Sequence, residues 1–206
     1  MDNRDQLPEF VRDTELPTEF DHHRAVTVHF KHLDRKKKEF WHRQQPPIGH
    51  GGYGLVWLER QVDRHGKLSD SKLRAVKQIR LSSTSTALQD YIRELEAIAK
   101  FSQEKYADYF VKSSGWFLDP ESLFIAMEYC PCGDLKRYLE THGAVGEKDA
   151  KLIVPQILKG LAHMHQEKFA HRDLKPAVSR EAFTTSTQSD RSYRMSSLYR
   201  CLPMNG

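Results

Sequence analysis

Apolar positions along the chain predict strands first and helices afterwards, which is an α+β arrangement. Short apolar or alternating runs favour strands at 55–58, 73–79, 109–118 and 122–128. Apolar residues at helical spacing favour helices over 86–100, 135–141 and about 146–167, although Pro155 falls inside the last of these. We therefore expect a small sheet region with one helix, followed by a helical region.

Turn residues separate these elements. His65-Gly66 marks a turn between the first two strands, and Asp119-Pro120-Glu121 joins the last two with proline at a favoured turn position. Pro131-Cys132-Gly133-Asp134 follows the last strand and precedes a helix. This change from strand to turn to helix predicts a hinge between two lobes.

Composition limits the class of protein. A length of 206 residues with 38% hydrophobic residues can form a core, although the mean hydropathy of −0.69 is rather polar. No stretch approaches the ~18 uncharged apolar residues of a membrane helix, and the first residues lack the pattern of a secretory signal. The three cysteines form neither an even framework nor a C-x-x-C pair. We expect no membrane association and a location in the reducing cytosol or the nucleus.

The net charge of +4 conceals a segregation of charge in the first 47 residues. Residues 1–21 are acidic, whereas residues 22–47 are basic and contain five histidines. Nuclear import through Arg35-Lys36-Lys37-Lys38, nucleic-acid contact and a metal site at His29-x-x-His32 are possible functions for this segment. A charged extension, either a solvated leader or an added strand, explains the pattern more simply, and nucleic-acid binding is not favoured. Pro46-Pro47 marks a boundary, so we expect the ordered domain to begin near Ile48.

A glycine-rich stretch follows, with the sequence Ile48-Gly49-His50-Gly51-Gly52-Tyr53-Gly54-Leu55-Val56. It is not a Walker A loop, which needs Lys-Ser/Thr after the last glycine. A dinucleotide fingerprint needs a helix at the last glycines, whereas the residues after Gly54 favour a strand. A hairpin that folds over nucleotide phosphates fits the pattern, because residues without Cβ atoms let backbone N–H groups approach an anion. A hairpin without a ligand is the alternative.

Two charged residues in later elements favour the phosphate-binding hairpin. Lys77 lies in the second predicted strand, at a distance from the glycines that would bring its ammonium group under the hairpin. Glu94 lies on the apolar side of the helix over 86–100, where an unpaired carboxylate is costly. We expect Glu94 to pair with Lys77, with a solvated glutamate at the rim as the alternative.

Together these stretches resemble a eukaryotic protein kinase of the serine/threonine type. The resemblance runs from about Ile48 to Ala177 and rests on the glycine hairpin, Ala75-Val76-Lys77, Glu94, Met127-Glu128-Tyr129-Cys130 and His171-Arg172-Asp173-Leu174-Lys175-Pro176. It implies a protein-kinase-like fold with a sheet lobe over 48–130 and an incomplete helical lobe over 131–177. Residues 1–47 and 178–206 lie outside it.

The resemblance also implies a site for ATP, with Mg²⁺ expected for the family. Residues implied to bind ATP are Ile48, Gly49, Gly51, Gly52, Gly54, Val56, Ala75, Lys77, Met127, Glu128, Cys130 and Asp134. Among these, Met127 would be the gatekeeper, the backbone of Glu128 and Cys130 would bond the adenine edge, and Asp134 would lie near the ribose. The implied catalytic residues are Lys77, Glu94, Asp173 and Lys175. Asp173 would accept the proton of a substrate hydroxyl, and Lys175 is the residue that favours the serine/threonine class.

The kinase pattern stops after residue 177. The family places a magnesium-binding asparagine where this chain has Val178, and no D-F-G or A-P-E follows. Residues 178–206 contain nine Ser or Thr and four Arg without a helical pattern, which predicts disorder. We expect no metal site and negligible phosphotransfer from this chain. Because Val-Ser can be encoded by the consensus that begins an intron, we hypothesise an unspliced intron or a misplaced exon edge, with a genuine short isoform as the alternative.

Two classes of function remain open at this stage. The first is ATP-dependent phosphorylation of protein serine or threonine by family, with an unidentified protein substrate. The second is a non-catalytic half-kinase that binds a nucleotide or a partner. The helix over 146–167 should expose an apolar stripe that would attract a chaperone or partner, formed by Ile153, Ile157, Leu161 and Met164.

Overall fold

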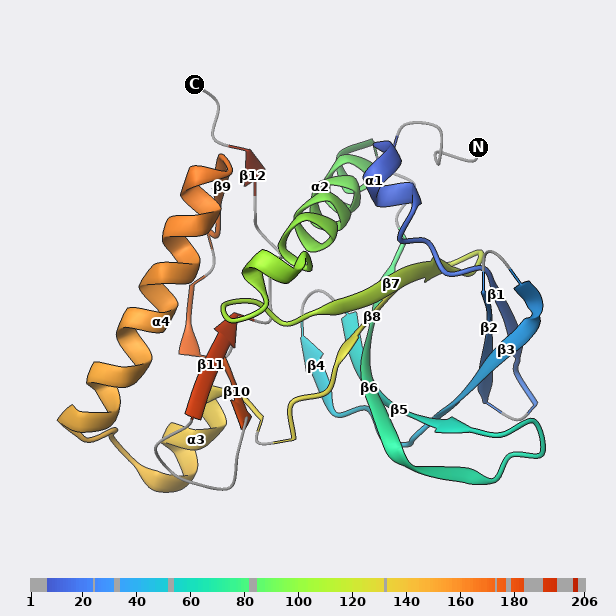
Figure 1. Cartoon of the computed structure of the whole chain (residues 1–206), viewed down its shortest axis with the longest axis horizontal. Coiled ribbons are helices and arrows are strands. Elements are labelled where there is room, and N and C mark those ends of the chain that lie inside the picture. Colours follow the sequence, from blue (N-terminus) through green and yellow to red (C-terminus); the bar gives the residue numbers. More distant parts are fainter. Residues whose placement is uncertain are drawn as a thin grey trace. The chain divides into compact units, whose positions relative to one another are not determined.

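The computed structural model describes residues 7–203, except 24, 32–33, 52–53, 82–84, 132, 173, 177–178, 184–190 and 196–201. It divides into two compact units (Figure 1). The first comprises Met1–Gln89 and Ser113–Tyr129, and the second comprises Asp90–Lys112 and Cys130–Gly206. The α+β class expected from the sequence is confirmed, since the first unit is built on a curled sheet and the second on helices.

An antiparallel sheet forms the first unit. Its strands run in the order β1-β2-β3-β5-β6-β8-β7, with β4 paired to β5. The elements are α1 (Glu9–Arg12), β1 (Thr18–Asp21), β2 (Val26–Lys31), β3 (Asp34–Arg43), β4 (Gly49–Gly51), β5 (Gly54–Val62), β6 (Leu68–Arg80), β7 (Ser113–Leu118) and β8 (Ser122–Glu128). The two turns predicted from the sequence both form. Asp63 Oδ1 accepts backbone N–H bonds at the first, and Asp119 Oδ1 does so at the second.

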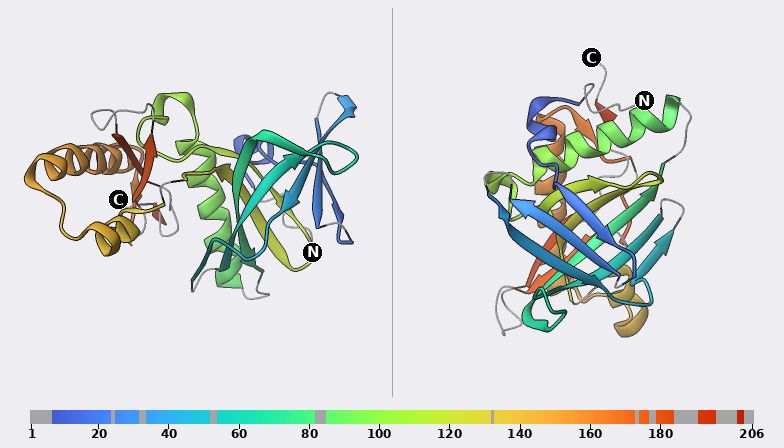
Figure 2. Two further views of the ribbon diagram at one scale, coloured as in Figure 1. Left: turned by 90° about the horizontal axis from the view of Figure 1, so that it is seen from below. Right: turned by 90° about the vertical axis from the view of Figure 1, so that its right-hand side faces the viewer.

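The sheet curls until its two edges meet and close a barrel (Figures 1 and 2). The closing contact joins β7 to residues 14–16, which lead into β1. Leu16 N donates to the carbonyl oxygen of Trp116 at 2.7 Å, and Trp116 N donates to that of Thr14 at 3.1 Å. In addition, the indole Nε1 of Trp116 donates to the carbonyl oxygen of Val11 at 2.9 Å, which ties α1 to the same strand. Closure satisfies backbone groups that an open edge would leave unpaired.

The barrel includes most of the segment that the sequence analysis treated as an extension. Strand β3 pairs with β5 from Phe40↔Val62 to Arg43↔Glu59, so the boundary expected at Ile48 falls inside one continuous sheet. The charged run concealed this strand, because exposed lysines at 36–38 precede the buried Trp41. Of the two forms of extension considered, the added strand is the one observed.

Aromatic and aliphatic side chains form the apolar part of the barrel interior. Val76, Phe117, Phe124 and Ala126 form a buried cluster against which Leu16 and Phe20 pack. The rings of Phe117 and Phe124 stack at 5.0 Å. Because side chains alternate along a strand, the residues next to Val76 in sequence belong to the other face of the sheet.

The second unit contains helices and short strands. The elements are α2 (Ser85–Phe101), which begins in the first unit, η2 (Glu104–Tyr106), α3 (Leu135–His142), α4 (Glu147–Gln166), β9 (Phe169–Ala170), β10 (Ser179–Phe183), β11 (Arg191–Met195) and β12 (Leu202–Pro203). The three helices predicted from periodicity lie within one residue of the observed bounds. Pro155 lies inside α4 as expected, at an exposed position.

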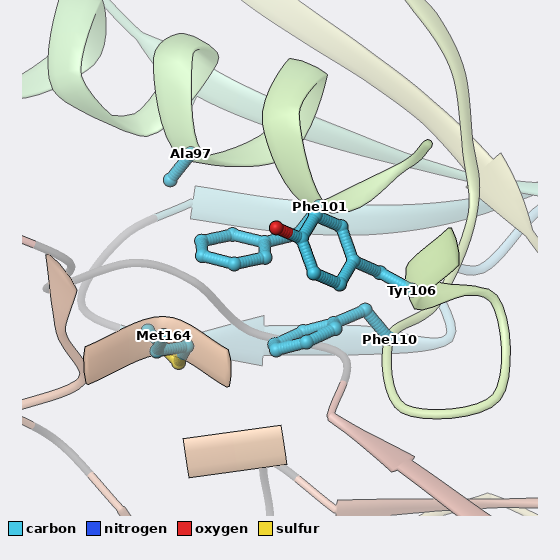
Figure 3. Close-up of a cluster of buried hydrophobic side chains, with 5 residues drawn as sticks. All are labelled: Ala97, Phe101, Tyr106, Phe110 and Met164. Atoms are coloured by element: carbon cyan, nitrogen blue, oxygen red, sulfur yellow. The ribbon is translucent and has the colours of Figure 1, made fainter. Parts of the chain in front are cut away.

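A compact apolar cluster joins α2, η2 and α4 (Figure 3). It consists of Ala97, Phe101, Tyr106, Phe110 and Met164. The rings of Phe101 and Phe110 stack at 4.6 Å. A second cluster pairs Leu135 of α3 with Ile153 of α4.

The exposed stripe predicted on α4 is therefore wrong. Ile153 and Met164 are buried in these clusters, and Ile157 and Leu161 are half-buried against them. The large apolar residues of α4 that are exposed lie beside this stripe and do not belong to it. They are Leu152, Val154 and Leu158, at 44%, 50% and 58% exposure. Periodicity located the apolar stripe, but the clusters of the second unit already cover it.

Parts of the tail form strands, although its composition predicted disorder. Strand β10 pairs antiparallel with β11 from Ser179↔Met195 to Phe183↔Arg191, and β12 pairs with β9. Strand β11 also contacts α4. Backbone pairing needs no apolar side chains, which is why composition did not indicate it.

Candidate functional site

The register of β5, β6 and β8 places four predicted ATP-binding residues on one face of the sheet, namely Val56, Ala75, Lys77 and Met127. Glu128 lies opposite Arg74 and therefore belongs to the other face. Val56 of β5 lies directly opposite Lys77 of β6, and Ala75 lies opposite Met127 of β8. Directly opposed residues in antiparallel strands present their side chains to the same face. The face outside the barrel interior, which we call the Lys77 face, carries Val56, Leu58, Ala75, Lys77, Ile125 and Met127.

The glycine hairpin lies beside this face. Strand β4 pairs with β5 through Gly49↔Val56 and Gly51↔Gly54, so Gly49, Val56 and Lys77 form one row across three strands. Gly54 has a φ of 122°, and a Cβ there would lie 1.9 Å from the carbonyl oxygen of Gln78. Only glycine fits such a position. The predicted Gly52 lies outside the described residues, and Ile48 at the entry to the hairpin is exposed.

Lys77 and Glu94 are both buried, at 8% and 5% exposure. Burial is unusual for either residue type, and a buried charge requires compensation. The position of Glu94 on the apolar side of α2 was predicted from periodicity and is observed. Lys77 belongs to the first unit and Glu94 to the second, and their pairing stays a prediction.

The remaining predicted residues occupy varied environments. Met127 and Glu128, at the end of β8, are half-buried, and Cys130 is a buried cysteine of the second unit. Asp134 caps α3, because its Oδ1 accepts the backbone N–H of Arg137 at 2.8 Å. Its predicted role at the ribose stays a prediction, as does that of Lys175, which is exposed. The predicted base Asp173 and the position of Val178 lie outside the described residues.

A buried polar cluster that was not predicted from the sequence lies on the opposite face of the same strands. Arg74 Nη2 donates to Glu59 Oε2 at 2.7 Å, and Arg43 Nη2 donates to Glu59 Oε1 at 3.1 Å. Arg74 Nη2 also bonds His29 Nε2 at 2.8 Å. Charged residues within strands usually face solvent, and no motif distinguishes these four. We call His29, Arg43, Glu59 and Arg74 the Glu59 cluster.

The contacts of His29 assign its tautomer. An arginine can only donate, so His29 Nε2 accepts from Arg74 and Nδ1 carries the proton that it donates to Thr18 Oγ1 at 2.8 Å. Burial, and after it the charge of Arg74, lower the pKa of His29 from 6.5 to about 3. Both ring nitrogens are engaged, so the metal site considered at His29 does not form there. Its second member, His32, lies outside the described residues.

Two further features concern metals and membranes. Within the described parts of the chain, no group of three or more His, Cys, Asp or Glu side chains lies close enough to hold a metal ion. No helix in those parts has the length and apolarity that a membrane span requires.

Comparisons with known proteins support the kinase resemblance. The family described as protein kinase domain matches residues 42–177. The serine/threonine-protein kinase RAD53 of Saccharomyces cerevisiae is 32% identical over 129 residues, which cover 63% of this chain and 14% of that protein. The serine/threonine-protein kinase ppk35 of Schizosaccharomyces pombe is 29% identical over 131 residues, covering 63% and 19%. This chain thus spans less than a fifth of either relative.

A solved structure agrees with the fold. The crystal structure of Rad53 1-466 in complex with AMP-PNP matches with a TM-score of 0.61 and 26% identity, and the match covers 76% of this chain and 38% of that one. The family match begins at residue 42, close to the end of β3, so most of β1–β3 precedes it. The chain belongs to the eukaryotic serine/threonine protein kinase family.

Proposed function

We propose that this chain binds ATP on the Lys77 face, beneath the glycine hairpin. The observation that carries the proposal is the row formed by Gly49, Val56 and Lys77 across β4, β5 and β6. It brings a flexible glycine backbone, an apolar side chain and a buried ammonium group onto one face. The match to a kinase structure in complex with AMP-PNP supports the same assignment.

Each part of this face has a chemical role in the proposal. Backbone N–H groups of the hairpin approach the phosphates, and the Lys77 ammonium pairs with the α- and β-phosphate oxygens. Val56 and Ala75 contact the adenine ring, with Met127 behind it. In the same proposal, Glu94 of the second unit orients Lys77, and the adenine edge is bonded by the backbone of Glu128 at the end of β8 and of Cys130 in the second unit.

We further propose that the 206-residue chain transfers phosphate negligibly. Family members use Mg²⁺ to neutralise charge on the transferring phosphate, and they hold it with an asparagine and the aspartate of D-F-G. Val178 stands at the position of the asparagine, and residues 178–206 contain no D-F-G. Asp173 could then accept a proton, but the charge that develops on the phosphate would lack its neutralising partner.

Thermal unfolding with and without ATP tests nucleotide binding. A ligand that binds only the folded state raises the unfolding temperature, by an amount that grows with its concentration over Kd. We expect ATP to raise it for the wild-type chain and not for Lys77→Met. A shift of equal size in Lys77→Met would contradict the proposed face.

Radiolabel transfer tests the second statement. We expect the wild-type chain with ATP and Mg²⁺ to label a generic protein substrate no faster than Asp173→Ala does. Faster labelling by the wild type would show that the chain is a competent kinase without the family's magnesium ligands.

A partner-binding function is the second candidate. It is favoured by the exposure of Leu152, Val154 and Leu158 along α4. A variant with Leu158→Lys should then lose binding to a partner or chaperone recovered with the wild type, whereas Lys148→Ala at the start of the same helix should not.

A location in the cytosol or nucleus stays a prediction.

A further inference from the structure

The Glu59 cluster joins the ATP-binding strands to strands that precede most of the family match. Glu59 and Arg74 are directly opposed on β5 and β6, at 0% and 4% exposure. Arg43 reaches the same carboxylate from β3, and His29 reaches Arg74 from β2. The Arg74 guanidinium also lies over the ring of Trp41 at 4.2 Å. Four strands of the barrel therefore meet at one buried ion pair.

This ion pair distinguishes the observed register of β5 and β6 from others. A shift of one residue would move Arg74 to the other face and would turn Lys77 into the barrel interior. A shift of two residues would place Val76 or Lys72 opposite Glu59, depending on its direction, and in both cases Arg74 would no longer lie opposite the carboxylate. Either change separates the Arg74 guanidinium from the buried carboxylate whose charge it compensates, which is strongly unfavourable.

We infer that the Glu59 cluster is a positioning network, which keeps Lys77 opposite Val56 and thereby makes β2 and β3 part of the ATP-binding machinery. The inference rests on the proposed ATP site. Arg74 lies three residues before Lys77 on β6, and Glu59 lies three residues after Val56 on β5, so the two pairs share the same ladder. The cluster acts through that ladder and does not touch the nucleotide.

The test removes both members of the buried ion pair, so that only Arg43, whose side chain is 19% exposed, loses its carboxylate partner. The variant Glu59→Leu/Arg74→Met removes both charges, and such replacements of buried pairs often keep or raise stability. We expect it to remain folded by circular dichroism and to bind a fluorescent ATP analogue at least about tenfold more weakly than the wild type. Val76→Ala provides the control, because it removes core volume from the same strand but leaves the cluster intact. We expect its ATP affinity to stay within about threefold of the wild type.

The register can be measured without ATP. Leu58 and Ala75 are directly opposed on the Lys77 face, so their methyl groups should give a nuclear Overhauser effect in the wild type. We expect that signal to be lost or strongly reduced in Glu59→Leu/Arg74→Met and kept in Val76→Ala. If the wild type binds no ATP but the signal behaves in this way, the ATP site is wrong and the register role of the cluster stands.

Two results would overturn the inference. The first is a double variant that keeps both the methyl signal and the ATP affinity, since register would then not depend on the ion pair. The second is a double variant that loses affinity while the methyl signal is intact, since the cluster would then act by another route than register.

Discussion

A Cβ atom on Gly54 would lie 1.9 Å from the carbonyl oxygen of Gln78, so the last glycine of the hairpin lies against the backbone of β6. Gln78 follows Lys77 directly in that strand. The side chain of Gln78 accepts from Trp57 Nε1 at 2.8 Å and donates to Ser122 Oγ at 3.0 Å, which fixes it within the barrel. The glycine hairpin and the lysine strand therefore pack without a spacer, and any side chain at Gly54 must separate them.

The first prediction concerns this close approach. Gly54→Ala should destabilise the chain by about 3 kcal/mol or more, because it combines a positive φ with a clash against backbone that cannot move freely. It should also weaken ATP binding, since the hairpin would be displaced from Lys77. Urea unfolding and titration with a fluorescent ATP analogue measure the two effects.

Gly66→Ala is the matched control for Gly54→Ala. Gly66 also has a positive φ, of 83°, but nothing lies within 4 Å of a Cβ at this turn. Gly66→Ala should lower the unfolding free energy by only about 1–2 kcal/mol, because alanine disfavours the left-handed backbone conformation, and it should leave ATP affinity unchanged. Equal losses in the two variants would mean that backbone conformation alone, and not the contact with Gln78, sets the requirement for glycine.

The second prediction concerns barrel closure at Gly115. A Cβ on this residue would lie 2.5 Å from the carbonyl oxygen of Thr14 and 2.8 Å from Leu16 Cγ. Gly115→Ala should push residues 14–16 off β7 and increase amide hydrogen exchange at Leu16 and Trp116, whose N–H groups close the barrel. Unchanged protection of both amides would contradict the closing contact.

The third prediction concerns pH. The pKa of His29 is lowered by burial, and after that by Arg74, to about 3 in the folded chain, so the unfolded chain takes up the proton at a higher pH. The contribution of neutral His29 is fully present above pH 6.5 and is lost as pH falls toward 3. The difference in unfolding free energy between wild type and His29→Gln should therefore shrink by about 1.4 kcal/mol per pH unit below 6.5. A difference that stays constant from pH 7 to pH 5 would contradict the buried neutral histidine.

The fourth prediction concerns the second unit. Glu167, which follows α4, accepts from Tyr106 Oη at 2.5 Å and pairs with Lys100 Nζ at 2.5 Å. The hydrogen bond from Lys100, followed by that from Tyr106, lowers the pKa of Glu167 to about 2. Its contribution is therefore present above pH 4.5 and is lost as pH falls toward 2.

Removing the Glu167 carboxylate should loosen these contacts at neutral pH. We expect Glu167→Gln to speed amide exchange at Tyr106 and near the end of α4, with a small effect on global stability because the carboxylate is partly exposed. Glu147→Gln is the comparison, since Glu147 forms only an exposed pair with Lys151 on the same helix. Exchange that is equal in the two variants would show that the Glu167 contacts contribute nothing specific.

Periodicity and turn residues were sufficient for the strands and helices of the kinase-like region. The strand that carries Lys77 was located from alternating apolar positions and the helix that carries Glu94 from apolar positions at helical spacing, because each buries one face. Before Pro46-Pro47 an added strand was considered only as one form of the extension, since the charged residues there suit a solvated leader equally well. The buried partnership of Glu59 with Arg74 could not be read from sequence either. It depends on a cross-strand register that only the closed barrel reveals.

ATP titration observed at methyl groups tests the central claim most directly. Val56, Ala75 and Met127 belong to the Lys77 face. Val76, which follows Ala75, and Ala126, which precedes Met127, lie instead in the barrel interior. We predict that ATP shifts the methyl signals of Val56, Ala75 and Met127 in a saturable manner and shifts those of Val76 and Ala126 far less. Saturable shifts confined to the interior residues, or no shifts at millimolar ATP, would contradict the account.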